Sequence, residues 1–547
     1  MPTSMERNPA DILRWLFDPQ HGLQDRLIPR WLFLRALAAI YFSAFYSLLF
    51  QIRGLLGPYG VLPAHQYLTA VEHSLSVPRY WVAPTLLWFS SSNAMLMALC
   101  WIGLIASVAA LLNLWPRLSF FISFVCYLSF VAAASDFSGY QSDGMLLEAG
   151  FIALFFCPSG LLPGWGAHSP PSRASLFLLQ WEWFRIYFES GMVKLLSGDP
   201  EWRHLTAMDE YYQNGPLPTW IGWYVEHLPH WFHVTTAAAT LFLELVLVFL
   251  LFFPRRVRLI LFFIVTPWEI GVILTANYTF LNYLVLALGF LLLDDGFVRR
   301  FVPARFRPPA PAVQEPLAES DVPLSLFESM EEPQPMRPGS SHLHSVRLAV
   351  AAVMLTWVAY ATTVELIHIP LPEVPLPSTP VSILEPFRIA NQYGLFAVMT
   401  RGRYEIEFQG SNDGQTWTPY PFRYKPQAIN QPPAIYAPYQ PRFDWNLWFA
   451  SLGEWQQNSL VPFAEERLLT NSPDVLSLFQ NNPFPDGPPK YIRAVLWQYW
   501  FTSMREKRET GNWWRRQLLG VYAPVLTRQP DGKFGVVEWP EPLPPHN

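Results

Sequence analysis

Long apolar runs separated by short polar stretches are the feature that most constrains the fold of this chain. A helix needs about 20 mainly apolar residues to cross a bilayer, and most of these runs approach that length. The runs are Trp31–Phe50, Ala94–Leu114, Leu118–Ala134, Met145–Phe156, Leu176–Leu196, Phe232–Phe253, Leu259–Ala276, Tyr278–Leu293 and Val346–Ile367. Two of them, Met145–Phe156 and Tyr278–Leu293, are short, so eight or ten spans also fit. We therefore predict a polytopic α-helical membrane protein with about nine spans.

The composition agrees with a membrane protein. Only 14% of the residues are charged, against about 25% in soluble proteins. The net charge of −5 and the lack of a large basic block argue against nucleic acid as a partner. Cys100, Cys126 and Cys157 lie in apolar runs without a CxxC spacing, so we expect neither disulfides nor a thiol redox centre. The charged first thirty residues argue against a cleaved signal peptide.

Basic residues between the runs predict the orientation, because Lys and Arg concentrate in cytoplasmic loops. With nine spans, most of the arginines fall on the side of the N-terminus. They are Arg7, Arg14, Arg26, Arg30, Arg117, Arg173, Arg255, Arg256, Arg258, Arg299, Arg300, Arg305 and Arg307. This pattern predicts a cytoplasmic N-terminus and an extracytoplasmic C-terminal domain, with the segment from Lys194 to His230 at the outer face.

The polar stretches divide the chain into six predicted segments. They are a cytoplasmic segment (1–30), a helical membrane domain (31–300), a disordered Pro-rich cytoplasmic linker (301–345), the last membrane helix (346–368), a Pro-rich neck (369–380) and an outer-face soluble domain (381–547). The last segment has a normal domain size.

The soluble segment shows both strand and helix patterns. The alternating sequence RYEIEFQGS (403–411), followed by Asp413–Gly414, predicts a β-hairpin. FDWNLWFASL and SPDVLSLFQN have helical spacing, and Ser472 before Pro473 is typical of an N-cap with Pro at the first helical position. We therefore expect an extramembrane α+β domain that contains a β layer.

Lys194 is the sharpest candidate for chemistry. It lies near the outward end of an apolar run, three residues before Ser197-Gly198-Asp199-Pro200. A lysine at membrane depth is costly and therefore a functional candidate, for example as a base or a cation. The alternatives are that its flexible side chain extends to the lipid headgroups, or that it pairs with Glu189 or with another intramembrane acid.

The stretch EHLPHWFH (226–233) contains a glutamate and three histidines. Histidines at such spacing can bind a metal, but a proline interrupts the helix, and the aromatic residues are typical of a membrane interface. We therefore favour interfacial histidines and expect no metal, and we keep His227 and His233 as candidates that assist Lys194. His204 and Asp209 also have the HxxxxD spacing of glycerolipid acyltransferases, but no phosphate-binding Gly-rich segment follows.

Several acidic residues lie within or beside the apolar runs. They are Asp136, Asp143, Glu148, Glu244 and Glu269. Such acids could line a proton or ion pathway, but the two halves of the chain do not carry matching broken helices. A transporter is therefore the third hypothesis.

The segment 184–295 resembles the core of the lipase maturation factor family. The resemblance rests on the sequences GMVK (191–194), GDPEWRHLTAMD (198–209), HLPHWFH (227–233) and NYTFLN (277–282), together with Glu244. In the soluble segment it extends to FRIANQYGLF (387–396), AIYAPYQPRFDWNLWFA (434–450) and NPFPDGPPKYIR (482–493). The chain departs from the family pattern at Glu210 and Asn214, and His204 occupies a variable position, which weakens the HxxxxD interpretation.

The resemblance implies a membrane factor that helps secreted lipases or other exported proteins reach their active state. Membrane lipids and a client protein would be the partners, and no cofactor is implied. The functional core carried over onto this chain comprises Glu189, Asp199, Trp202, Arg203, Asp209, Tyr211, Trp231 and Asn282. The low cysteine content favours a bacterial member in the inner membrane.

A remoter similarity relates residues 191–202 to the group of transmembrane proteins that includes vitamin K-dependent γ-carboxylase. It covers one helix and its exit. The lysine base of that enzyme follows a comparable helix end, so the similarity makes Lys194 a candidate without making it catalytic. The alternative to a folding factor is thus a membrane enzyme that acts on a lipid, a quinone-like molecule or a protein.

The folding-factor hypothesis needs a surface that can hold an unfinished client. We predict that aromatic residues of the outward loop provide it together with the C-terminal domain; the alternative is that these aromatic residues simply lie at the level of the headgroups. These residues are Trp202, Tyr211, Tyr212, Trp220, Trp223 and Trp231.

Overall fold

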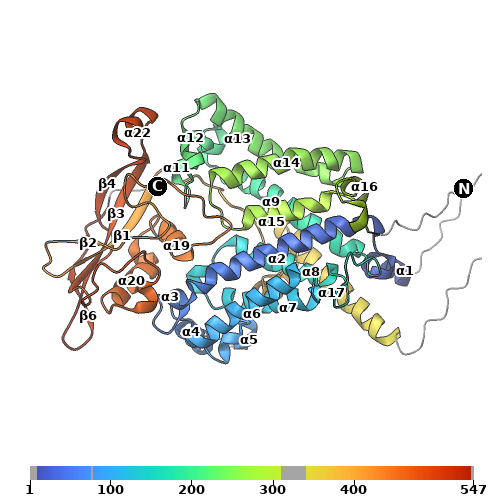
Figure 1. The fold of residues 1–547 in the computed structure, drawn as a ribbon, viewed down its shortest axis with the longest axis horizontal. Helices are drawn as coiled ribbons and strands as arrows, with labels where there is room; N and C mark the ends of the chain where they lie inside the picture. The colour runs from blue at the N-terminus through green and yellow to red at the C-terminus, as the bar shows by residue number, and fades with distance from the viewer. Residues whose placement is uncertain (1–8, 75–77, 309–340, 544–547) are drawn as a thin grey trace, which may run out of the picture.

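The computed structural model describes residues 9–74, 78–308 and 341–543 of the chain. A body of helices fills most of the molecule, and an antiparallel β-sheet lies at one end of it (Figure 1). The N-terminal helix α1 (Pro9–Phe17) lies at the opposite end. The molecule is therefore elongated, with the helical body between two different ends.

Five helices among the described residues are long and apolar enough to cross a membrane. They are Gln24–Leu49, which contains α2 (Leu27–Leu49), α6 (Asn93–Leu111), His230–Phe252, which begins with α13 (His230–Leu245), α14 (Arg255–Thr275), and His342–His368 within α17 (Ser341–His368). These helices support the prediction of a multi-pass α-helical membrane protein.

The other four predicted spans form helices that are shorter or more polar. They are α7 (Pro116–Val131), α8 (Gln141–Phe156), α9 (Arg173–Leu196) and α15 (Leu281–Gly289). Helix α9 is long enough to cross a bilayer but carries several charged side chains. About nine crossings thus remains a prediction.

Short helices connect the long ones at the two ends of the body. They are α3 (Ile52–Leu56), α4 (Ala64–Ser74), α5 (Arg79–Val82), α10 (Pro200–Arg203), α11 (Ala207–Asn214), α12 (Trp220–Glu226), α16 (Asp295–Val298) and α18 (Thr379–Leu384). Most of the predicted Pro-rich linker (301–345) lies outside the described residues.

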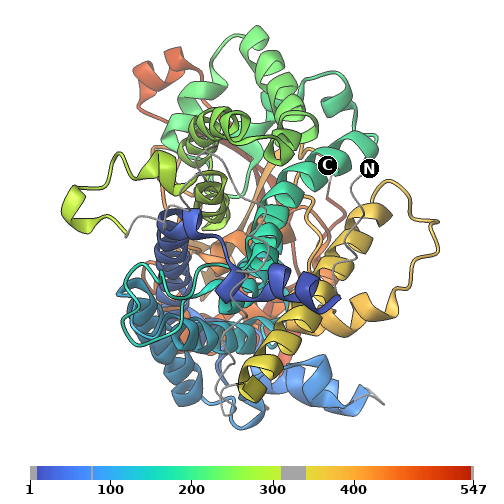
Figure 2. The ribbon, with the colours of Figure 1, turned by 90° about the vertical axis from the view of Figure 1, so that its right-hand side faces the viewer.

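Helix α9 lies in the middle of the helices, as the view along the long axis shows (Figure 2). It contacts α8, α13, α15 and α17. A polar side chain on α9 is therefore surrounded by other helices instead of lipid. This position explains how the sequence can place several charged residues on one apolar helix.

Arginines from several loops meet at the end that carries α1. The Arg26 guanidinium donates to the carbonyl of Leu293, and Arg173 donates to the carbonyl of His21. Arg255 pairs with Asp294. These contacts bring loops that are far apart in the sequence to one end of the molecule, opposite the sheet.

The sheet contains six antiparallel strands in the order β2-β1-β3-β5-β6, with β4 paired to β3. The strands are β1 (Arg403–Ser411), β2 (Thr418–Pro419), β3 (Tyr491–Phe501), β4 (Trp514–Val521), β5 (Val525–Arg528) and β6 (Phe534–Glu538). The helices of this part are α19 (Arg442–Ala450), α20 (Leu460–Leu468), α21 (Pro473–Leu476) and α22 (Met504–Thr510). A C-terminal β domain is thus present, as predicted.

The predicted hairpin is confirmed. Gln409 of β1 pairs with Pro419 of β2, and Gly414 in the turn has a φ of +74°, which favours glycine. The Asp413 carboxylate accepts hydrogen bonds from the backbone N–H groups of Thr416 and Gln415, and these bonds lower the pKa of Asp413. The side chain of Asp413 therefore stabilises the turn.

The predicted N-cap is only partly right. Ser472 does precede α21, with Pro473 at the first helical position. Its hydroxyl does not cap the helix, however, because it donates to the carbonyl of Tyr59 at 2.8 Å. Ser472 therefore joins the sheet domain to a loop between membrane helices.

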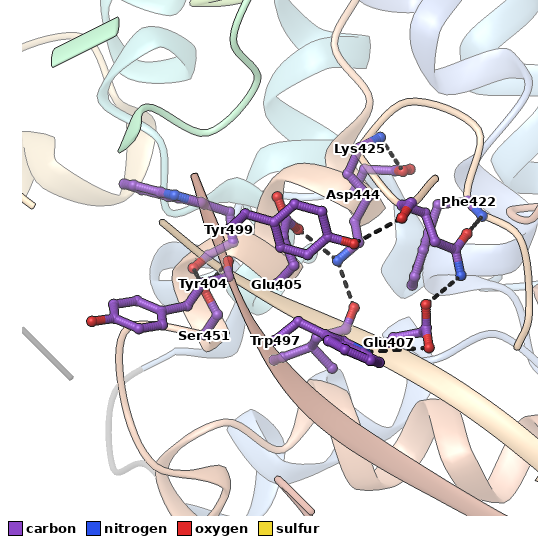
Figure 3. A network of polar contacts seen from close by, with 12 residues as sticks. Tyr404, Glu405, Glu407, Phe422, Lys425, Asp444, Ser451, Trp497 and Tyr499 are labelled. Atoms are coloured by element: carbon purple, nitrogen blue, oxygen red, sulfur yellow. Dashed lines mark hydrogen bonds and ion pairs between the residues drawn. The ribbon is translucent and has the colours of Figure 1, made fainter. Parts of the chain in front are cut away.

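Strand β1 is buried on both faces. All nine of its residues are buried, because α19 packs against one face, where Phe408 and Phe443 stack. On the other face the Lys425 ammonium lies 2.7 Å from a Glu405 carboxylate oxygen (Figure 3). The alternating sequence thus separates an apolar face from a buried polar network.

Asp444 in this network provides a test of the fold by pH. Its buried carboxylate accepts hydrogen bonds from the backbone N–H groups of Tyr424 and Lys425 at 3.2 and 3.1 Å. Burial raises the pKa of Asp444 from 3.8 to about 6, although the hydrogen bond from the Lys425 N–H group by itself lowers this pKa. The folded state thus binds the proton more tightly than the unfolded state between about pH 4 and 6.

We therefore expect Asp444 to lower the free energy of unfolding as the pH rises through this range. A shift of about two pKa units corresponds to about 3 kcal/mol. Asp444→Asn keeps the acceptor oxygen and removes the charge. The difference in melting temperature between the variant and the wild type should grow between pH 4 and 6 and level off above pH 6. A difference independent of pH between 4 and 6 would contradict a raised pKa of Asp444 in the folded protein.

Candidate functional site

A cavity of about 390 Å³ lies among the helices, beside Lys194. Helices α9, α10, α11, α12, α13, α14 and α15 form its walls together with Tyr393, Leu395 and Phe396. Most of the lining residues are apolar or aromatic. The polar side chains include Lys194, Glu244, Glu269, Asn282, Tyr187 and Ser190. An apolar pocket with a few grouped polar side chains is typical of a ligand-binding or active site.

The end of α9 positions Lys194. Lys194 lies in the last turn of the helix, and Gly198 follows with a φ of +78°, which lets the chain turn toward α10. The lysine side chain is only 5% exposed. Its ammonium lies 2.6 and 2.8 Å from the two carboxylate oxygens of Glu244 on α13.

Two further groups hold the lysine inside the protein. The Lys194 ammonium donates to the Ser190 hydroxyl at 2.6 Å, and it lies 5.2 Å from the centre of the Trp202 ring. Lys194 therefore does not extend to the headgroups, and its partner is Glu244. The alternative that it pairs with Glu189 is wrong, because the spacing of five residues turns the two side chains away from each other.

Glu269 forms the second polar group of the cavity. The Tyr187 hydroxyl donates to one of its oxygens at 2.8 Å, and the Asn282 amide donates to the other at 2.5 Å. Glu269 lies on α14, Tyr187 on α9 and Asn282 on α15. Glu244 and Glu269, which the sequence offered as acids of a pathway, thus line the same cavity.

Glu189 binds the C-terminal part of the chain. One of its oxygens accepts from the Tyr393 N–H at 2.6 Å, and the other lies 3.7 Å from the Arg185 guanidinium. Arg185 also pairs with Glu148 and donates to the carbonyl of Asn391 at 2.6 Å. These acids and this arginine hold residues 391–393 against α8 and α9, although they do not themselves line the cavity.

Asp199 and Trp202 bind the same segment farther along. The Asp199 carboxylate accepts from the Met399 N–H at 2.7 Å, and the Trp202 ring N–H donates to the carbonyl of Phe396 at 2.8 Å. At Gly394 an added Cβ would lie 2.9 Å from Val193, so the backbone passes close to α9. Segment 391–399 is therefore fixed as one wall of the cavity.

The other predicted core residues divide between the cavity and the surface. Tyr211 and Asn282 line the cavity. Arg203 and Trp231 are exposed, and Trp231 is 67% exposed. The carboxylate of Asp209 lies 3.0 Å from the ring of His230, away from Lys194.

The structure does not bring His227 and His233 to Lys194. Neither lines the cavity. The two ring nitrogens of His227 lie 2.7 and 2.9 Å from the carbonyls of Trp223 and Thr502, and a ring nitrogen of His233 lies 3.1 Å from the carbonyl of Leu228. Among the described residues, no three His, Cys, Asp or Glu side chains are grouped so that they could hold a metal ion.

The predicted aromatic surface is mostly absent. Trp202, Tyr212 and Trp223 are at most 4% exposed, because they pack against segments of the C-terminal domain. Trp223, for example, packs with Phe501 and Trp514. Only Trp220 and Trp231 of the six predicted residues are strongly exposed. The hypothesis that all six hold a client at the surface is therefore wrong.

Comparison with known proteins gives matches in both parts of the chain. The model of the lipase maturation factor transmembrane domain matches residues 28–300, and the model of the lipase maturation factor C-terminal domain matches residues 389–524.

Individual relatives match over nearly the whole chain. Lipase maturation factor 2 of Gallus gallus is 34% identical over 91% of this chain and 81% of its own length. Lipase maturation factor 1 of Bos taurus is 30% identical over 94% of this chain and 92% of its own length. Lipase maturation factor 2 of Homo sapiens is 31% identical over 91% of this chain and 83% of its own length. No solved structure matches.

Proposed function

The chain belongs to the lipase maturation factor family, and from this premise we propose that it helps a secreted lipase or another exported protein to reach its folded, active state. The observation that carries the proposal is that the similarity spans both the helical part and the sheet domain. A protein that shared only the membrane helices could use them for another purpose. Here both domains of the family are matched.

We place this activity at the outer face of a bacterial inner membrane, with the N-terminus in the cytoplasm. Two features support this orientation. The arginine-rich loops meet at the end that carries α1, and such loops favour the cytoplasm. The sheet domain lies at the other end (Figure 1), where an exported protein would meet it.

The edge of the sheet is the surface that best suits a client. Among the described residues, β6 is the last strand on its side of the sheet. It exposes Val536 and Val537, and the exposed Trp539 follows it. An unpaired strand edge can add a strand of an incompletely folded chain. The sheet domain would thus hold the client while the helices anchor it to the membrane.

Deletion of the gene tests the proposal. We expect that cells without it secrete lipase with a lower activity per unit of lipase protein, and that the restored wild-type gene returns this specific activity. Lipase activity and lipase protein in the culture medium are measured together, so that a change in export is separated from a change in folding. An unchanged specific activity after deletion would contradict the lipase role.

A second candidate function is that of a membrane enzyme in which Lys194 acts as a base. The observation in its favour is that the Lys194–Glu244 pair lies at a mainly apolar cavity, an arrangement that suits a lysine held by a carboxylate beside a bound substrate. The paired substitutions of Lys194 and Glu244 test whether Lys194 does more than stabilise the fold, which this candidate requires.

A further inference from the structure

The cavity beside Lys194 lies at membrane depth between two groups of helices. One wall is α13, which packs against α9 and α11, and the opposite wall is α14, which packs against α15 and α12. Both α13 and α14 belong to candidate membrane spans. Two walls of the cavity are therefore helices that are long and apolar enough to cross the bilayer.

Each wall presents one helical stripe to the cavity. On α13 the stripe is Phe232, Thr236, Thr240 and Glu244, which follow one another at intervals of four residues. The two threonine hydroxyls donate to the carbonyls of Phe232 and Thr236 in their own helix at 2.9 and 2.8 Å. They are thus already bonded, and the stripe is effectively apolar from Phe232 as far as Glu244.

The opposite stripe on α14 contains Pro267, Gly271 and Thr275. At Gly271 an added Cβ would meet no atom within 4 Å. The cavity is therefore open beside Gly271, and a small residue keeps it open. A volume of about 390 Å³ lies toward the low end of the roughly 300–1,000 Å³ of small-molecule sites, which fits one acyl chain better than two.

The charges in the cavity restrict the head of such a ligand. Lys194 already has Glu244 as its partner, and Glu269 is a second carboxyl group in the same cavity. An anionic head would lie beside these two acids, and a cationic head would compete with Lys194. A hydroxyl or carbonyl head can instead donate to a carboxylate or accept from the ammonium without adding charge.

We propose that this cavity binds one molecule of a neutral single-chain lipid, of the monoacylglycerol or long-chain alcohol class. The head lies at Lys194, Glu244 and Glu269, and the chain follows the stripes of α13 and α14. This inference rests on the cavity alone and does not depend on the lipase role.

Photo-cross-linking tests the inference. The purified full chain in detergent is irradiated with a monoacylglycerol that carries a diazirine on its acyl chain, and labelled peptides are identified by mass spectrometry. We expect labels on α13 and α14, and loss of these labels when unlabelled monoacylglycerol is added. Labels restricted to other helices, or labels that unlabelled lipid does not reduce, would overturn the proposal.

Gly271→Trp provides the decisive variant because its side chain would fill the cavity. We expect labelling of α13 and α14 to fall by about tenfold or more, since the contact surface for the chain is lost. Ile270→Trp is the matched control, because Ile270 is the neighbouring residue, is 44% exposed and does not line the cavity. Equal labelling of both variants and the wild type would show that the lipid binds only to the outer surface.

Two additions keep the test informative. If Gly271→Trp does not accumulate in the cell, Gly271→Leu takes its place, because the leucine side chain fills less of the cavity. We expect the labelling of Gly271→Leu to fall below that of Ile270→Trp. Labelling equal to that of Ile270→Trp would overturn the proposal. The charge argument is tested with a diazirine fatty acid at a pH where it is ionised. We expect it to label the two helices less than the monoacylglycerol, and stronger labelling would overturn the choice of a neutral head.

Discussion

Replacement of Arg442 by methionine is expected to destabilise the folded protein by about 3–5 kcal/mol, because it leaves a buried carboxylate without its partner. Arg442 belongs to α19 of the sheet domain and is fully buried. Its guanidinium contacts both oxygens of Asp143 on α8 at 2.8 Å, and it lies 2.9 Å from the Tyr127 hydroxyl of α7. This group joins the sheet domain to the membrane helices.

The expected loss is measured as the amount of folded protein after membrane extraction and as its melting temperature. Arg505→Met is the matched control, because Arg505 pairs with Glu509 at 2.8 Å on the surface, where it is 84% exposed. Exposed pairs contribute only about 0–1 kcal/mol. The double variant Arg442→Met/Asp143→Asn should recover part of the stability, since it removes the unpaired charge. Wild-type stability of Arg442→Met alone would contradict the structural role of this pair.

The second large effect is expected at Lys194 and Glu244. Lys194→Met leaves Glu244 buried without its cation, so that the protein should lose about 3–5 kcal/mol of stability together with its activity in lipase maturation. The double variant Lys194→Met/Glu244→Gln removes both members of the ion pair and leaves no unpaired charge at this position. We expect it to recover most of the stability, because two neutral side chains of similar size replace the ion pair.

The lipase assay of the double variant separates structure from function. If Lys194 acts on a ligand or a client, the stable double variant should still fail to restore the specific activity of the lipase in cells that lack the gene. If the double variant restored both the stability of the protein and the specific activity of the lipase, the role of the pair would be purely structural. Wild-type behaviour of Lys194→Met in every assay would exclude the enzyme hypothesis.

The sequence predicted those features that depend on neighbouring residues. Apolar runs of about 20 residues predicted helices that can cross a membrane, and Asp413–Gly414 predicted the hairpin between β1 and β2, because turn chemistry is local. The motif that ends α9 also identified the segment that forms the candidate site. Lys194, Asp199 and Trp202 all lie at or beside the cavity wall.

Features that depend on distant contacts could not be predicted in this way. Glu244 lies 50 residues after Lys194, and no spacing rule connects two helices that are separated by a long loop. The aromatic residues show the same limit, since Trp223 has the sequence context of an interfacial residue but is buried against the sheet. Segment 387–396 stands out in the sequence only as a family motif, although its residues Tyr393, Leu395 and Phe396 complete the cavity.

The most direct test of the central claim is the refolding of a secreted lipase from the same cells. The unfolded lipase is diluted into proteoliposomes that carry this protein, and the recovered activity is compared with that in liposomes without protein and in liposomes with Arg442→Met. We predict a higher yield of active lipase with the wild type than with either control. Equal yields in all three would contradict a direct role in lipase maturation.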